Sequence, residues 1–451
     1  MKNREAGLQP EAVEAKKSNA ISYEGCAAAL GKGEAVDPKA KLEQNTAVTD
    51  TGAYADFLTP YQEQSEFTPD QIDQIYQETI TSGIIDHHSI DSFFASKGIK
   101  SEKCATQMVA DYPEAVLELI KVNGVKQVET HFDSDMDAIC SAYLTKSLID
   151  NGQLPGLAEK LASITNMLDY GRLSELGEDY NAPENFVQTL PGVFSSLKSA
   201  FSEVASQRIK KEGFSPAILA EAEAQRNAAF FEILNLAEQS GVDVTGDISV
   251  LDSQLSEELL DFLKTGQESI KEEYKQFQKE FAKAETIETQ NGDPVIIAKS
   301  PKPLTFTNLA YLQTSPETIV AVFGGLEREA NDHYDIGIQP DQAKNIDLRG
   351  LCLALNKTER KKRDQILVKD DSEKTDAEKE LVTGWQKEKT REAFAGLNEM
   401  IDNGEVNEND VLDIDPTVLV AGNSLIAASR SALLTQSEFT QTIKEFFKSQ
   451  K

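Results

Sequence analysis

The stretch THFDSDMDAICSAYL, residues 130–144, constrains the fold more than any other part of the chain. The residues before it, 124–130, have the pattern of a short strand, and residues 138–148 place apolar side chains at helical spacing. The stretch therefore predicts a turn from a strand into a helix. In an open parallel sheet such a turn lies at the carboxyl end of a strand, where sites usually form.

This turn is crowded with side chains that bind cations. His131, Asp135 and Asp137 follow the spacing H-x-x-x-D-x-D, and Asp133 lies between them. Carboxylates this close together repel one another unless a cation neutralises them. The pattern therefore predicts a metal site at the start of the helix.

The length and charge of the chain narrow its class and its partners. Its 451 residues are enough for two or three domains with cores of their own. It has 76 acidic and 45 basic side chains, and the net charge of −31 argues against broad contacts with nucleic acid or with anionic lipid. We therefore expect neither a long nucleic acid nor a membrane as the partner.

Sequence signals also favour a cytoplasmic protein. No apolar run approaches the roughly 18 residues that a membrane span needs, and the start MKNREAGLQPEAVEAKK has no apolar core of a signal peptide. The four cysteines show no CxxC spacing, which argues against a zinc cluster and a disulfide framework. The oligomeric state has no sequence signal.

Two further predicted strands end in potential ligands. Residues 45–50, NTAVTD, predict a strand that ends at Asp50, and residues 81–85 predict another, which is followed by Asp86, His87 and His88. A single histidine is more often structural than a ligand. However, three of the four histidines in this chain follow predicted strands beside aspartates, which favours a metal site.

Two motifs together resemble the DHH phosphoesterase superfamily, which includes family II inorganic pyrophosphatases, exopolyphosphatases, RecJ-type exonucleases and oligoribonucleases. The segment HFDSDMDAICSA at 131–142 is similar to the motif H-x-x-x-D-x-D-A, and GIIDHH at 83–88 carries the DHH triplet. The resemblance implies an α/β protein with a DHH-type parallel-sheet catalytic domain, a helical middle segment and a smaller α/β C-terminal domain. It also implies metal-dependent hydrolysis of a small phosphoanhydride or phosphodiester.

The resemblance also implies a metal ligand set. His131 and Asp135 would hold one divalent cation, and Asp137 and His87 would hold the second. The remaining carboxylates implied by the family are matched by Asp50, which would bridge the two cations, with Asp56 as the alternative, and by Asp169, which follows a predicted helix.

Two more residues of the DHH triplet have implied roles outside the ligand set. His88 would face the substrate phosphate, and Asp86 would orient the histidines. The order of the motifs differs from that of the superfamily, in which H-x-x-x-D-x-D precedes DHH. A permuted connection can keep such a site, because the site depends on which strand ends meet.

This ligand set implies chemistry with Mn²⁺ or Mg²⁺, two cations per active site. In such centres the cations lie on the order of 3.5–4 Å apart and share a hydroxide that attacks phosphorus. A serine or cysteine nucleophile is then unnecessary. We interpret Ser141 as a residue of the helix start and Cys140 as a small core side chain.

The composition and pattern along the chain predict four segments. Residues 1–44 resemble a weakly ordered arm, 45–190 the metal-binding catalytic domain, 191–290 a helical insertion or linker, and 291–451 a C-terminal α/β substrate-binding domain. The charges of the helical segment predict a solvated face, and a partner-binding or dimerising element is the alternative. In the last segment we expect strands at 294–298, 318–323 and 334–338, a helix at 346–367, a strand within 411–428 and a helix at 436–448.

Candidate substrate contacts in the C-terminal segment are His333, Arg349 and Arg430, because guanidinium and imidazole groups suit phosphate oxygens. The basic run ERKKRDQ at 359–365 is interpreted as a solvated helix face. The main functional alternative is a non-catalytic protein that keeps the metal site as a scaffold and acts as a regulatory or partner-binding module.

Overall fold

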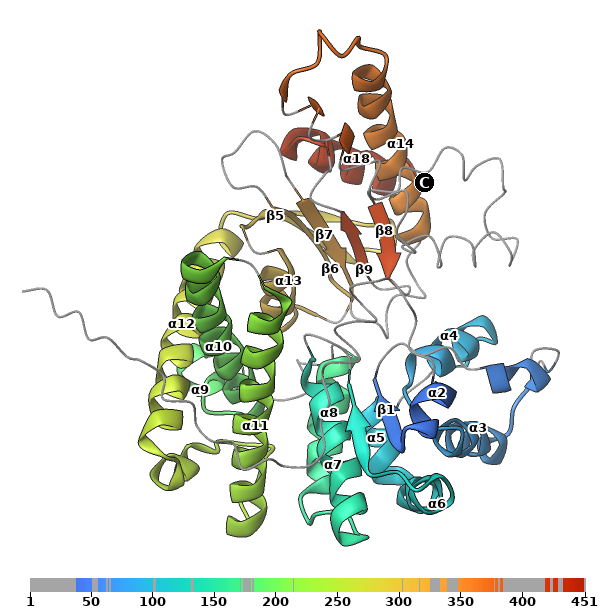
Figure 1. Ribbon diagram of the computed structural model, residues 1–451. Coiled ribbons are helices and arrows are strands. Elements are labelled where there is room, and N and C mark those ends of the chain that lie inside the picture. The colour runs from blue at the N-terminus through green and yellow to red at the C-terminus, as the bar shows by residue number, and fades with distance from the viewer. Residues whose placement is uncertain are drawn as a thin grey trace, which may run out of the picture. The chain divides into compact units, whose positions relative to one another are not determined.

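The computed structural model describes residues 38–50, 56–61, 64, 66–99, 103–130, 134–170, 172, 180, 182–213, 215–301, 303–315, 317–324, 333–338, 348–376, 378–379, 382–383, 418–421, 425–428 and 433–449. The chain forms two compact units (Figure 1). The first comprises residues 1–165 and 194–266, and the second comprises 166–193 and 267–451. The helical segment predicted at 191–290 is thus divided between the two units.

The first unit is built on a parallel sheet of three short strands in the order β2-β1-β3. The strands are β1 (Thr46–Thr49), β2 (Ile84–Ile85) and β3 (Gln127–Glu129). Each lies inside a segment predicted to be a strand, so these three predictions are confirmed. All four residues of β1 are buried, as expected for the central strand of a parallel sheet with both faces covered.

Local signals fix the helices that flank β1 and β2. Helix α3 (Pro69–Thr81) begins at a capping box, because Thr68 Oγ1 accepts from Gln71 N–H and Gln71 Oε1 accepts from Thr68 N–H. Helix α2 (Pro38–Glu43) lies just before β1, at the end of the predicted arm, and Lys41 Nζ pairs with the buried Glu129 of β3 at 2.7 Å. Residues 1–37 of that arm lie outside the described residues.

The connection between β2 and β3 contains three helices that we did not predict. They are α4 (His88–Ser96), α5 (Ala105–Asp111) and α6 (Pro113–Asn123). Helix α6 carries signals that were present in the sequence, since Pro113 occupies its first turn and Gly124 ends it in a left-handed conformation with φ 62°.

The helix after β3 is α7 (Met136–Asn151), which confirms the helix predicted from residue 138. Its first eight residues, among them Cys140 and Ser141, are almost entirely buried, and Ser141 Oγ donates to the carbonyl of Ala138 at 3.0 Å. Burial raises the pKa of the Cys140 thiol. This environment agrees with structural roles for both side chains.

Helix α11 (Pro216–Ser240) runs beside α7 in the same direction (Figure 1). Near the start of α7, Glu223 contacts Ser134, and in the middle Tyr143 donates a hydrogen bond to Asn235 at 3.1 Å. Beyond the end of α7, Glu238 accepts hydrogen bonds from the N–H groups of Gly156 and Leu157 at 2.7 and 2.9 Å. Part of the predicted helical middle is therefore built into the unit that carries the predicted catalytic motifs.

The remaining helices continue along the chain. The boundary between the two units falls within α8 (Ala158–Asp169), α10 (Leu190–Glu212) and α12 (Glu257–Phe281). Helix α9 (Pro183–Phe186) belongs to the second unit. Short 3₁₀ helices lie at Asp56–Tyr61 and Ser249–Gln254. None of the helices that the structure describes is long and apolar enough to cross a membrane.

The second unit contains a six-stranded mixed sheet in the order β4-β5-β6-β7-β9-β8, in which only β5 and β6 pair in parallel. The elements are β4 (Glu285–Glu288), β5 (Pro294–Lys299), α13 (Pro303–Tyr311), β6 (Ile319–Gly324), β7 (His333–Gly337), α14 (Leu348–Leu367), β8 (Val418–Ala421), β9 (Leu425–Ala428) and α18 (Gln436–Ser449). The strands predicted at 294–298, 318–323 and 334–338 and the two predicted helices are confirmed. The single strand predicted within 411–428 is instead two antiparallel strands, β8 and β9, and β4 and α13 were not predicted.

The basic run at 359–365 lies on α14, as predicted, but it is not a solvated face throughout. Glu359 is buried and accepts hydrogen bonds from the N–H groups of Leu433 and Leu434 at 2.6 and 3.1 Å, and Arg363 is buried as well. The interpretation as a solvated face is wrong for these two residues, because both are buried, and Glu359 holds α14 against the segment that leads into α18.

Candidate metal centre

Three side chains from the ends of β1 and β2 meet in the first unit. Asp50, His87 and His88 offer ligand atoms that all lie within 4.8 Å of one another. Asp50 Oδ1 lies 3.6 Å from His87 Nε2 and 3.3 Å from His88 Nδ1. Because β1 and β2 are parallel neighbours, the residues that follow them come together at one edge of the sheet.

Asp50 is held in a conformation that costs free energy. It has a φ of 47°, in the left-handed region, and its side chain is buried. Its N–H donates to the carbonyl of Ile85 at 2.8 Å, which ties the residue after β1 to the end of β2. Strained and buried charged residues are concentrated at functional sites, so both features support a functional role for Asp50.

Asp137 joins this group from the first turn of α7. It is buried, and its Oδ2 lies 3.8 Å from His87 Nε2. Burial, followed by the negative charge of Asp50, raises the pKa of Asp137. The two carboxylates therefore oppose each other's ionisation, and a divalent cation beside His87 Nε2 would remove that conflict.

Asp137 also has a structural role that the sequence did not reveal. Its Oδ2 accepts from the N–H of Ala105 at 2.8 Å, and its Oδ1 accepts from the N–H and hydroxyl of Thr106 at 2.8 and 2.6 Å. It thus caps the N-terminus of α5 across 31 or 32 residues of sequence. The Cys104 side chain also forms a hydrogen bond with this carboxylate, so a cation would share the Asp137 oxygens with the groups that they cap.

His87 is oriented by a residue that sequence reasoning missed. Its Nδ1 lies 2.8 Å from Asp91 Oδ2, four residues further along the chain. With the Nδ1 proton donated to Asp91, the lone pair of Nε2 faces Asp50 and Asp137. This carboxylate–histidine pair is characteristic of metal-binding histidines. The available signal was the i, i+4 spacing of the two residues at the start of α4.

His88 differs from His87 in exposure and in partners. Its side chain is 57% exposed, and its Nδ1 lies 3.0 Å from the Oδ1 of the fully buried Asp86. Burial lowers the pKa of His88, but the hydrogen bonds to Asp50 and Asp86 outweigh it and raise the pKa to about 11. The exposure of the ring weakens these attractions through solvent screening.

The partner aspartate shows the complementary shift. Burial alone would raise the pKa of Asp86, but the hydrogen bond and the positive charge of His88 lower it. Asp86 also accepts from the N–H of His88 at 2.9 Å. It therefore orients His88, as the resemblance implies, whereas the partner of His87 is Asp91.

The structure leaves the other implied ligands as predictions. His131 lies outside the described residues. Asp135 is exposed, caps α7 by accepting from the N–H of Ala138 at 3.0 Å, and is not one of the group formed by Asp50, His87 and His88. Asp56 is the first residue of a 3₁₀ helix. Asp169 ends α8 and is assigned to the second unit.

The structure does not test the three predicted substrate contacts. Arg430 lies outside the described residues. His333 is the first residue of β7 and Arg349 is the second residue of α14, and their side chains lie outside what the structure describes. All three stay predictions.

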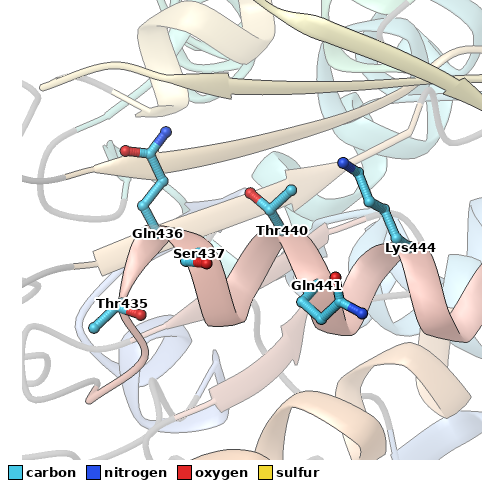
Figure 2. Close-up of a pocket in the computed structure, with 6 residues that line it drawn as sticks. All are labelled: Thr435, Gln436, Ser437, Thr440, Gln441 and Lys444. Carbon is cyan, nitrogen blue, oxygen red and sulfur yellow. The ribbon is translucent and has the colours of Figure 1, made fainter.

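A surface depression of 560 Å³ lies in the second unit, away from these motifs in sequence, and is lined by polar residues along α18 (Figure 2). Its one charged lining residue, Lys444, pairs with Glu285 at 2.6 Å. It contains no potential ligand of the metal centre.

Comparisons with protein-family models, with curated proteins and with solved structures gave no match.

We predict that Asp91→Asn weakens Mn²⁺ binding about 10–100-fold, because the histidine tautomer and orientation would no longer be fixed by a carboxylate. Isothermal titration calorimetry measures this affinity. Asp150→Asn is the matched control, since Asp150 also accepts from a side chain at i, i+4 spacing, that of Lys146, but on the exposed part of α7. Equal affinity of Asp91→Asn and wild type would contradict the assignment.

We predict that Asp137→Ala lowers the free energy of unfolding and also reduces the stabilisation that Mn²⁺ gives. Loss of the cap leaves donors at the start of α5 without their acceptor, at about 1–3 kcal/mol for each buried group. Urea unfolding with and without Mn²⁺ separates the two effects. Bound metal raises the free energy of unfolding by about 2.7 kcal/mol when the free Mn²⁺ concentration is 100 times the Kd.

The matched control for Asp137 is Thr106→Val, which removes one hydrogen bond of the cap and keeps the carboxylate. This variant should lose stability and still be stabilised by Mn²⁺. An unchanged Mn²⁺ response in Asp137→Ala would show that the residue is only a helix cap.

Proposed function

We propose that this protein is a metal-dependent phosphoesterase of the DHH type that hydrolyses a small phosphoanhydride or phosphodiester. The observation that carries the proposal is the position of His87 Nε2, which lies 3.6 Å from Asp50 and 3.8 Å from Asp137 while Asp91 holds the other ring nitrogen. Oxygen ligands with one imidazole suit Mn²⁺ or Mg²⁺.

The proposed ligand set has two parts. Asp50 and Asp137 lie close to His87 Nε2. The resemblance adds His131, Asp135 and Asp169 to complete the set for two cations. When bound, the cations would lower the pKa of a water molecule and neutralise negative charge on phosphoryl oxygens. The strand order supports this proposal, because β1, which precedes Asp50, lies between the strands that precede the two motifs, although the order of the motifs along the chain differs from the superfamily.

The protein's own groups have distinct tasks in this mechanism. Asp91 keeps His87 in the tautomer that presents Nε2 toward Asp50 and Asp137. The hydrogen bonds to Asp50 and Asp86 favour the imidazolium form of His88, which would donate to a phosphate oxygen as negative charge develops there. Asp86 fixes the direction of that donor through the Nδ1 contact at 3.0 Å. The net charge of −31 favours a small substrate over a long polyanion.

The proposal is tested by a hydrolysis screen with the full chain and Mn²⁺. The four substrate types are pyrophosphate, polyphosphate, short oligonucleotides, and linear or cyclic dinucleotides. We expect turnover of at least one of them, lost on chelation and restored by Mn²⁺. Binding of Mn²⁺ without turnover of any substrate would overturn the enzymatic proposal in favour of a non-catalytic metal-site scaffold.

We further predict different effects for the two histidines of the DHH triplet. His88→Ala should lower kcat by about 10²–10³-fold, the usual loss for one donor to a developing charge, with little change in Mn²⁺ affinity. His87→Ala should weaken Mn²⁺ binding itself. Calorimetry and steady-state kinetics on the same preparations measure both. A comparable loss of Mn²⁺ affinity in the two variants would make His88 a ligand.

A further inference from the structure

A buried ion pair on α11 contacts Ser134, which lies in the connection from β3 to α7. Glu223 and Arg226 are one turn apart, and both are more than 90% buried. Arg226 Nη2 lies 3.3 Å from Glu223 Oε1. Both residues fall in the segment whose charges we predicted to lie mostly on a solvated face, and this buried pair is an exception.

The pair holds both backbone polar groups of Ser134. Glu223 Oε1 accepts from the N–H of Ser134 at 2.7 Å and from its hydroxyl at 3.1 Å, and Arg226 Nη2 donates to its carbonyl at 2.8 Å. The Ser134 hydroxyl also lies 2.8 Å from the hydroxyl of Thr130, which directly follows β3. The position of Ser134 is therefore set by α11 as well as by its own chain neighbours.

Arg226 is itself held on two further sides. Its Nε donates to Asn227 Oδ1 at 2.9 Å, and its guanidinium lies 5.3 Å from the ring centre of Phe194. A planar guanidinium fixed by hydrogen bonds and by an aromatic face has little freedom to move. The carbonyl of Ser134 is therefore bound to a rigid donor.

Stability alone is a weak reason for this arrangement. Burying two charges costs several kcal/mol for each ion, and replacing a buried pair by apolar side chains of similar volume is often neutral or stabilising. The location of the pair is more informative. Ser134 directly precedes Asp135, which caps α7, and lies one turn before Asp137, whose Oδ2 faces His87 Nε2 at 3.8 Å. A shift of Ser134 would shift that first turn.

We propose that Glu223 and Arg226 are positioning residues of the metal centre, which hold the start of α7 so that Asp137 stays at the distance from His87 that a shared cation requires. The inference rests on the metal site of the proposed function but not on turnover. A displacement of about 1 Å is enough to impair a preorganised site.

The test uses the double variant Glu223→Gln, Arg226→Met in the full chain. It removes both charges together, so that no unpaired buried charge is left to unfold the protein. We expect Mn²⁺ affinity to fall about 10–100-fold by calorimetry, as for other groups that orient metal ligands. Urea unfolding without Mn²⁺ measures stability separately.

The matched control is Glu238→Gln. Glu238 lies on the same helix, about 22 Å further along it at 1.5 Å per residue, and also accepts from two backbone N–H groups. It should keep wild-type Mn²⁺ affinity. Arg226→Lys is a second variant, which keeps both charges of the pair and should retain more of the wild-type Mn²⁺ affinity than the double variant does.

The outcomes separate the two proposals. Unchanged Mn²⁺ affinity in the folded double variant, or an equal loss in Glu238→Gln, overturns the positioning role and leaves the phosphoesterase proposal standing. Reduced Mn²⁺ affinity in the double variant with no turnover of any substrate by the wild type supports the positioning role and overturns the enzymatic proposal. A wild type that binds no Mn²⁺ overturns both.

Discussion

The repulsion between two buried carboxylates is the constraint on which the rest of this structure depends. Asp50 and Asp137 both lie within 4 Å of one imidazole nitrogen, and burial together with the negative charge of Asp50 raises the pKa of Asp137. A fold selected for stability alone would not place them there. The sheet order β2-β1-β3 and the cap on α5 hold them together, which makes a bound cation the simplest physical reason for the arrangement.

The start of α7 shows how closely the fold and the site are connected. Within four residues, Ser134 is bound by the ion pair of α11, Asp135 caps α7, and Asp137 caps α5 while facing His87. Each polar group here has a structural partner in addition to its proposed chemical one. Consequently a change in one of them affects both the folding and the chemistry, and measurements of stability and of metal affinity have to be made side by side.

Short-range sequence signals predicted the strands and the helix that carry the motifs, because strand patterns and helical spacing act within a few residues. That Asp50 and His87 would meet was implied by the resemblance to the DHH superfamily. The role of Asp91 was missed although its i, i+4 spacing from His87 was a short-range signal, whereas the roles of Asp137 and Glu223 in holding other groups were not predictable in this way. The contacts of Asp137 and Glu223 join positions 31 to 89 residues apart, and a charged residue on a helix has the same sequence pattern whether it is buried or solvated.

The central claim is that Asp50, His87 and Asp137 share a cation, and anomalous diffraction at the manganese absorption edge tests it most directly. In crystals grown with Mn²⁺, we expect an anomalous peak within about 2.5 Å of His87 Nε2 and of an oxygen from each of the two aspartates. Manganese bound elsewhere, with these three side chains contacting only protein atoms, would contradict the account.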